Sequence, residues 1–168
     1  MQKNDRDEET LRAVGLRPAI LEDEPFLRQL FATTRADELA LMPLDDKQKE
    51  ALIAMQFKAQ SQQYAMSYPD ANHSIVLLND VPIGRQLINR SENAFTLVDI
   101  ALLPTYRGAG IGTHLIEKLL VEASSLGKPV RLSVWHSNPA KRLYERVGFS
   151  ETNADGDVYC EMCWNPVS

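Results

Sequence analysis

Apolar positions along the chain follow two different periods, and the change of period separates helices from strands. Phe26, Leu27, Leu30 and Phe31 form a stripe at helical spacing,. Similar stripes predict four helices, over residues 21–39, 45–66, 113–126 and 138–147,. Alternating or short apolar runs bounded by turn residues predict strands over residues 14–20, 74–78, 83–89, 94–103, 130–135, 149–152 and 158–164,.

The order of these elements predicts the fold class. Along the chain they run β-α-α-β-β-β-α-β-α-β-β, so that hairpins come first and strand-helix-strand crossovers follow. This order predicts an α/β (α+β) protein with a mixed, mostly antiparallel sheet of about seven strands and helices on both faces. We expect one domain over residues 13–168 and a loose, flexible tail over residues 1–12, which is charged and poor in apolar residues,.

Composition narrows the function classes. The 168 residues are 44% hydrophobic and 24% charged, with a formal net charge of −5. These values are ordinary for a globular protein, and the negative charge disfavours nucleic acid as the main partner. Residues 1–9 do not resemble a signal peptide, and no apolar run is long enough to span a membrane,. We therefore expect a cytoplasmic protein with no membrane partner.

Cys160 and Cys163 form the only C-x-x-C pattern. No second cysteine pair or nearby histidine accompanies them, so the sequence predicts no metal site. Residues three apart in a strand point to opposite faces, which also disfavours a disulfide between them. We expect both thiols to be reduced and structural.

Three glycines lie between a predicted strand and a predicted helix, in the segment from Arg107 to Thr113. Glycine lets backbone N–H groups approach an anion closely, and a helix start adds unpaired donors and a favourable dipole. The spacing therefore fits either a phosphate-binding loop or a turn required for close packing. The glycine spacing does not match a dinucleotide-binding fingerprint, and no Gly-Lys-Ser/Thr follows as in a P-loop.

Two segments together carry a more specific signal. Residues 99–112 read DIALLPTYRGAGIG, and residues 138–149 read NPAKRLYERVGF on the predicted crossover helix. Together they closely resemble the acetyl-CoA-binding motif and the following helix motif of the GCN5-related N-acetyltransferase (GNAT) family. The order of elements is also that family's order, so the resemblance covers residues 14–164 and implies the acyl-CoA N-acyltransferase fold.

The resemblance implies transfer of an acetyl group from acetyl-CoA to a primary amine by direct attack on the thioester. Loop amides would hold the pyrophosphate of coenzyme A, strand backbone would pair with the pantetheine arm, and Asn138 would contact the cofactor. Tyr144 matches the family's usual proton donor to the leaving thiolate, although packing alone would also explain a tyrosine there. The residues assigned to the cofactor are Ile100, Ala101, Leu102, Arg107, Gly108, Ala109, Gly110, Ile111, Gly112, Thr113, Asn138 and Tyr144.

A general base is harder to assign. Ser133 and Thr96 occupy positions where many relatives carry a glutamate. Asp99 is the remaining catalytic candidate, because a carboxylate in an apolar run must be paired or functional; pairing to Arg85 or Arg131 is the simpler explanation. A water chain could also remove the amine proton. A non-catalytic module that binds acyl-CoA therefore stays open as an alternative.

The resemblance leaves the acceptor open. In the family, the first two helices and the late hairpin build the acceptor site, which here means residues 21–66 and 154–157. A small amine, a peptide N-terminus and a lysine side chain all fit as acceptors, and a homodimer is one open assembly. Lys141 and Arg142 could contact phosphates or simply form a solvated helix face,.

Overall fold

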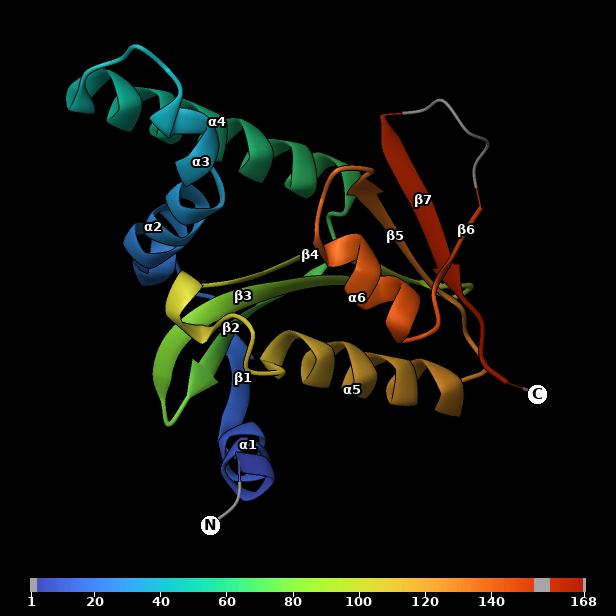
Figure 1. The fold of residues 1–168 in the computed structure, drawn as a ribbon. Coiled ribbons are helices and arrows are strands. Elements are labelled where there is room, and N and C mark those ends of the chain that lie inside the picture. Colours follow the sequence, from blue (N-terminus) through green and yellow to red (C-terminus); the bar gives the residue numbers. More distant parts are fainter. Residues whose placement is uncertain (1–2, 153–157, 168) are drawn as a thin grey trace.

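A seven-stranded sheet forms the centre of the protein, in the order β1-β2-β3-β4-β5-β7-β6 (Figure 1). The computed structural model describes residues 3–152 and 158–167. The strands are β1 (Val14–Pro18), β2 (Asn72–Leu78), β3 (Val81–Arg90), β4 (Phe95–Leu102), β5 (Val130–Trp135), β6 (Ser150–Glu151) and β7 (Tyr159–Trp164). Neighbouring strands are antiparallel except β4 and β5, which are parallel. The predicted fold class is confirmed.

Helices cover both faces of this sheet (Figure 1). They are α1 (Lys3–Arg12), α2 (Glu24–Thr34), α3 (Ala36–Ala40), α4 (Asp46–Ser67), α5 (Ile111–Ser125) and α6 (Ala140–Arg146). Two 3₁₀ turns, η1 (Leu21–Asp23) and η2 (Pro104–Tyr106), precede α2 and the glycine loop. Helices α2 and α4 lie over one face, whereas α5 and α6 lie over the other.

Alternation along β2 shows how one strand serves both faces. Ile75 packs against Phe31 of α2 and Phe57 of α4. Its neighbour Val76 packs against Ile111 and other residues on the opposite face. Both strand residues are fully buried, because successive side chains of a strand point in opposite directions,.

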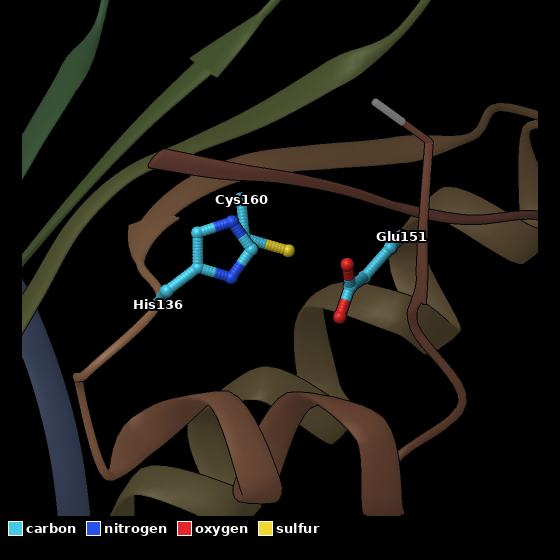
Figure 2. A group of neighbouring side chains, drawn as sticks. All are labelled: His136, Glu151 and Cys160. Carbon is cyan, nitrogen blue, oxygen red and sulfur yellow. The ribbon is translucent and has the colours of Figure 1, made fainter. Parts of the chain in front are cut away.

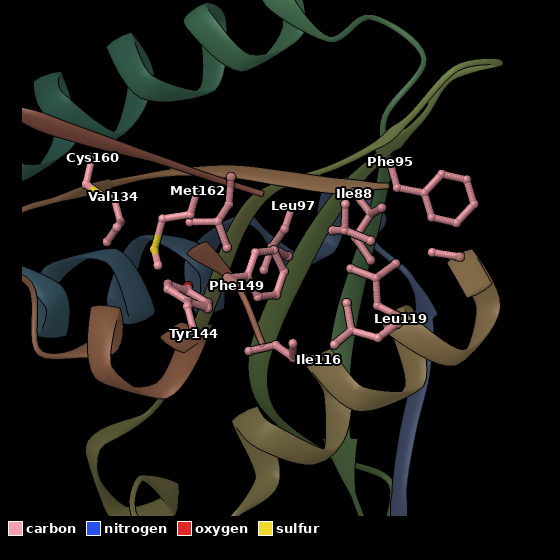
Figure 3. Packing of buried hydrophobic residues seen from close by; sticks show 14 residues of the cluster. Ile88, Phe95, Leu97, Ile116, Leu119, Val134, Tyr144, Phe149, Cys160 and Met162 are labelled. Carbon is pink, nitrogen blue, oxygen red and sulfur yellow. The ribbon is translucent and has the colours of Figure 1, made fainter. Parts of the chain in front are cut away.

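The largest group of buried apolar side chains lies under α5 and α6 (Figure 3). Cys160 and Met162 of β7 belong to it, as do Tyr144 of α6 and Phe149. The rings of Tyr144 and Phe149 meet edge to face, with centroids 5.9 Å apart. Cys160 is fully buried and both cysteines are free, as the strand geometry predicted.

Local signals also fix two predicted boundaries. Asp45 caps α4 by accepting a hydrogen bond from the Gln48 N–H at 2.8 Å,. Asn79 and Asp80 both have positive φ angles, 48° and 65°, which is the geometry of a tight hairpin turn between β2 and β3,. These turn residues set the register of the two strands.

The N-terminal segment differs from expectation. Residues 3–12 form helix α1 where the polar composition predicted a loose tail. Helical spacing brings Glu8 Oε2 within 3.8 Å of Arg12 Nη2. Leu11 packs against the apolar cluster at β1 and β2. The apolar contact of Leu11 thus accompanies helix formation by a largely charged segment,. None of the helices among the described residues combines the length and apolarity that a membrane crossing requires.

Candidate active site

Strands β4 and β5 separate soon after they begin to pair. Their parallel pairing is confined to Phe95 with Val130 and Thr96 with Arg131, although β4 continues to Leu102. The second half of β4 therefore has a neighbour on only one side, β3. The strands leave a wedge whose β4 edge carries backbone groups available to a ligand.

Alternation along β4 indicates which backbone groups line this wedge. The Leu103 N–H donates to the Ile83 carbonyl of the β3 side at 2.8 Å. A Cβ added to Gly84 of β3 would lie 2.3 Å from the Ala101 carbonyl oxygen, so that group also faces β3. Because the direction alternates from residue to residue, the N–H and C=O groups of Ile100 and Leu102 face the wedge. Of the three residues expected to pair with pantetheine, Ala101 has its backbone directed to the sheet.

The glycine loop follows β4 and η2 and leads into α5. Gly108 and Gly110 have φ angles of 76° and 81°, which side-chain-bearing residues rarely adopt,. A Cβ added at Gly108, Gly110 or Gly112 would meet no other atom within 4 Å. These glycines therefore border open space, so close internal packing does not explain them.

Backbone donors gather at this open space. Among the described residues, the N–H groups of residues 108–113 donate to no backbone or side-chain acceptor, and no side chain caps α5. The next N–H along the chain, that of His114, donates a hydrogen bond to the Gly110 carbonyl at 2.9 Å. Unpaired amides at a helix start attract anions, so the loop fits a phosphate group. The Arg107 N–H donates to Pro104 at 3.2 Å and is not part of this set.

Two arginines flank the loop in different ways. The Arg107 side chain turns back to β4 and α2, where it donates to the Leu102 carbonyl at 2.9 Å and to Thr33 Oγ1 at 3.3 Å. Arg146 of α6 reaches the loop itself, with a contact of 3.5 Å to Thr113 Oγ1. Lys141, which the sequence offered as a phosphate contact, pairs instead with Glu151. No sequence pattern indicates the contact of Arg146 with the loop, because only the fold brings the end of α6 beside it.

A cavity of about 170 Å³ lies beside the wedge. Its walls come from α2, α4, β3, β4 and the segment before α6. They are formed by Leu30, Phe31, Thr34, Gln60, Arg85, Asp99, Ile100, Ala101 and Asn138. Residues of α2 and α4, in the first two helical regions, line this cavity, whereas residues 154–157 lie outside the described residues.

An ion pair forms part of this cavity wall. Arg85 Nε donates to Asp99 Oδ2 at 2.6 Å, and a second guanidinium nitrogen donates to Gln60 Oε1 at 2.7 Å. The guanidinium also lies 5.8 Å from the ring centroid of Tyr64,. Burial, reinforced by the nearby Asp99, raises the pKa of Tyr64 to about 12, which keeps its hydroxyl protonated. Asp99 pairs with Arg85, one of the two partners that the sequence suggested.

Tyr144 lies in the core under α5 and α6 and is not among the residues that line the cavity. Its ring is buried against Phe149, and its hydroxyl makes no hydrogen bond to the described residues (Figure 3). Burial is the main cause that raises the pKa of Tyr144 to about 12, and the charge of Asp99 adds to it. The side chain therefore offers a protonated, unengaged hydroxyl in the electrostatic field of Asp99.

Asn138 lies at the mouth of the cavity and begins the turn into α6. Its Oδ1 accepts a hydrogen bond from the Ala140 N–H at 2.9 Å, which is the capping role that the sequence allowed. It is also exposed and lines the cavity, so its amide nitrogen can serve a ligand at the same time. Ser133, one of the positions considered for a base, faces away from the α5–α6 core and pairs across the sheet with Glu161 of β7.

Comparison with known proteins identifies the family to which this geometry belongs. Residues 69–151 match the family model described as acetyltransferase (GNAT) domain. The chain carries a GNAT acetyltransferase domain. This domain contains the wedge, the glycine loop and all of α6, so the resemblance carried by the two sequence motifs is confirmed.

One curated relative matches part of this GNAT chain. It is the [ribosomal protein bS18]-alanine N-acetyltransferase of Haemophilus influenzae, 37% identical over 82 residues. The match spans 48% of this chain and 56% of the relative, so it covers little more than half the length of that protein.

Solved structures support the fold over nearly the whole chain. The PaiA N-acetyltransferase of Thermoplasma acidophilum, crystallised with coenzyme A, superposes with a TM-score of 0.66 at 19% identity, covering 90% of this chain and 98% of that one. The ribosomal-protein-S18-alanine N-acetyltransferase of Escherichia coli gives a TM-score of 0.61 at 21% identity, covering 92% and 96%. At these identities the superpositions establish the GNAT fold alone.

Proposed function

We propose that the chain is an acetyl-CoA-dependent N-acetyltransferase that transfers the acetyl group to a primary amine by direct attack on the thioester. The observation that carries the proposal is the continuity of the site. Free loop amides lead into the β4–β5 wedge, and the wedge opens onto a cavity that contains Asp99. Anion binding, thioester binding and amine binding thus follow one another along a single path.

The residues present fit coenzyme A. The amides of residues 108–113 bind the pyrophosphate, and Arg146 adds a positive charge beside Thr113,. The wedge-facing backbone groups of Ile100 and the Leu102 N–H pair with the pantetheine arm, whereas the Leu102 carbonyl already accepts from Arg107. A backbone N–H of β4 donates to the thioester carbonyl oxygen, where negative charge develops during attack. Acetyl-CoA supplies an activated acetyl group and a thiolate that can leave.

Tyr144 and Asp99 act in the two proton transfers, to the leaving thiolate and from the acceptor amine. The Tyr144 hydroxyl, kept protonated by burial, donates its proton to the departing sulfur,. The Asp99 carboxylate, held in one orientation by Arg85, accepts a hydrogen bond from the acceptor amine. The proton that the amine loses passes from there to water, because Asp99 is the one carboxylate among the described residues that line the cavity,.

The acceptor that we favour is the amino group at the N-terminus of a peptide or protein. Support comes from the partial match to an enzyme named for acetylating an alanine of ribosomal protein bS18. The cavity beside Asp99 is small, so an amine at a chain end enters it while the remainder of a peptide lies outside. Small amines and lysine side chains are the competing acceptors in the same test.

Turnover with defined amines tests the proposal. Purified protein and acetyl-CoA are incubated with an N-terminal alanine peptide, the same peptide N-terminally blocked but carrying a lysine, and a polyamine. Free thiol release and the mass of each peptide are measured. We expect stoichiometric thiol release and acetylation with the free N-terminus. If acetyl-CoA protects the protein against thermal unfolding but no amine is acetylated, the chain is instead an acyl-CoA-binding module.

A further inference from the structure

Three potential metal ligands meet at the end of the sheet, outside the proposed acetyl-transfer path. His136 follows β5, Glu151 ends β6, and Cys160 lies in β7. One ligand atom from each side chain lies within 4.8 Å of the other two. Figure 2 shows the imidazole, the carboxylate and the sulfur directed toward a common space.

The sheet brings these residues together from separate parts of the sequence. Cys160 pairs with Val134 across β5 and β7, which places its sulfur near the residues that follow β5. Glu151 pairs with Met162, so it lies on the other side of β7. Because backbone pairing fixes all three positions, ligand binding requires adjustment of side chains rather than refolding of the chain.

The three residues of the cluster differ in burial: one is closed off from solvent and two are open to it. Cys160 is fully buried, whereas His136 and Glu151 are exposed. An ion bound between them would have protein ligands on one side and solvent on the other. This arrangement leaves a coordination position for water, as in zinc sites with three protein ligands.

The ligand set favours zinc over the hard cations. Thiolate, imidazole and carboxylate all bind Zn²⁺, at about 2.3, 2.0 and 2.0–2.2 Å respectively, whereas Mg²⁺ and Ca²⁺ prefer oxygen alone. A thiolate and a carboxylate together neutralise a divalent ion. The ammonium group of Lys141 pairs with Glu151 and lies 4.0 Å from Glu145. Glu145 can therefore retain Lys141 when a metal takes Glu151.

We propose that His136, Glu151 and Cys160 form a zinc site with water as the fourth ligand. The ion connects the residue after β5 to β6 and β7, two positions before Asn138 and the turn into α6. The site is structural or regulatory with respect to that turn, because none of its three ligands lines the cavity beside the wedge.

Metal titration of the full chain tests the site directly. Reduced protein is stripped with a chelator and titrated with Zn²⁺ against a chromophoric chelator, and Co²⁺ is then used as a spectroscopic substitute. We expect one zinc ion per chain and a thiolate-to-cobalt charge-transfer band. His136→Ala and Glu151→Gln, both at exposed positions, should weaken zinc binding by more than ~10-fold, the lower end of the loss seen even for outer-shell partners.

Variants at the two cysteines identify the thiolate. Cys160→Ser should abolish the charge-transfer band, whereas Cys163→Ser, three residues away in the same strand, should retain it. The proposal is overturned if the parent protein binds no zinc, if His136→Ala binds zinc as tightly as the parent, or if the band follows Cys163. The two exposed-site variants keep the test valid should Cys160→Ser fail to fold.

Discussion

Arg85 Nε lies 2.6 Å from Asp99 Oδ2, and this pair forms part of the wall of the cavity beside the β4–β5 wedge. The Arg85 side chain is only 7% exposed, and that of Asp99 is 23% exposed. The pair therefore has two roles to distinguish. It balances a buried guanidinium, and it presents the accessible carboxylate to an acceptor amine.

Asp99→Asn separates the two roles. The substitution leaves Arg85 buried without its counter-ion, which we expect to lower the free energy of unfolding by about 3 kcal/mol. If Asp99 also positions the amine, acetylation at saturating acetyl-CoA should fall by more than the loss of folded protein explains. Chemical denaturation and steady-state kinetics on the same preparation measure both effects. Asp70→Asn, at an exposed carboxylate, is the control and should change neither quantity,.

Tyr144→Phe removes the proposed proton donor while keeping the ring in the core. Because the hydroxyl bonds to none of the described residues, stability should change little. We expect kcat to fall by roughly 100-fold or more, the usual contribution of a positioned acid, with unchanged affinity for coenzyme A. Calorimetric binding and initial rates measure the two quantities. Tyr68→Phe, at the C-terminal end of α4, is the matched control; an unaltered kcat in Tyr144→Phe would leave Tyr144 with a packing role only.

Sequence patterns predicted most elements because each was marked locally. Alternation in β5 and the cap at Asp45 fixed boundaries that the structure reproduces. The helical stripe of α4 was less informative. In the sequence, one face of this helix carries Leu52, Met55, Ala59 and Gln63 at helical spacing, but the structure buries Ile53 and Phe57 instead. In a helix with apolar residues on several sides, the sheet and α2 decide which face is covered.

The candidate site was predictable only where its parts are contiguous in sequence. The glycine loop and the start of α6 each carry their own motif. The contact of Arg146 with Thr113, and the meeting of His136 with Cys160, depend on crossovers that no local pattern reveals. The same holds for the choice between Arg85 and Arg131 as the partner of Asp99, which strand register decides.

Gly110 offers a paired test of anion binding by the loop. Asparagine and aspartate both tolerate a positive φ angle and have the same size, so the two substitutions impose similar strain at φ 81°,. Only aspartate adds negative charge where we propose that the loop holds the phosphates of coenzyme A. We expect Gly110→Asp to bind coenzyme A at least ~10-fold more weakly than Gly110→Asn, from charge repulsion alone. Isothermal titration measures the difference.

The control for Gly110 is Gly127, which has a φ angle of 63° at the C-terminal end of α5. Gly127→Asp and Gly127→Asn should bind coenzyme A equally well. Equal affinities for the two Gly110 variants would show that the loop does not hold the phosphates.

Asp23 predicts a dependence of stability on pH. Two guanidinium nitrogens of Arg17 each lie 2.7 Å from its carboxylate, and the Ile20 N–H lies 2.9 Å away. The hydrogen bonds from Arg17 are the main cause that lowers the pKa of Asp23 from 3.8 to about 2. A carboxyl group whose pKa is lower in the folded than in the unfolded state stabilises the protein when the pH is above the pKa of the group in the unfolded chain. This stabilisation is lost as the pH falls through the folded value.

Asp23→Asn should therefore be less stable than the parent at neutral pH. The difference in unfolding free energy should shrink between pH 3.8 and about pH 2,. Denaturation of both proteins across this range measures it. A difference that stays constant down to pH 2 would contradict a role for the Asp23 charge in holding the start of α2.

Gly84 tests whether the shape of β4 matters for the cofactor. A Cβ at this buried position would lie 2.3 Å from the Ala101 carbonyl oxygen and 2.7 Å from Leu102 Cδ2, so β4 would have to move. Gly84→Ala should lower the free energy of unfolding by about 1–3 kcal/mol, as overpacking does. It should also weaken coenzyme A binding, because displacement of Leu102 alters the edge of the wedge. Gly15→Ala in β1, where the new Cβ would meet no atom within 4 Å, should leave coenzyme A affinity intact. If Gly84→Ala loses stability yet binds coenzyme A normally, the β4 edge is not part of the cofactor site.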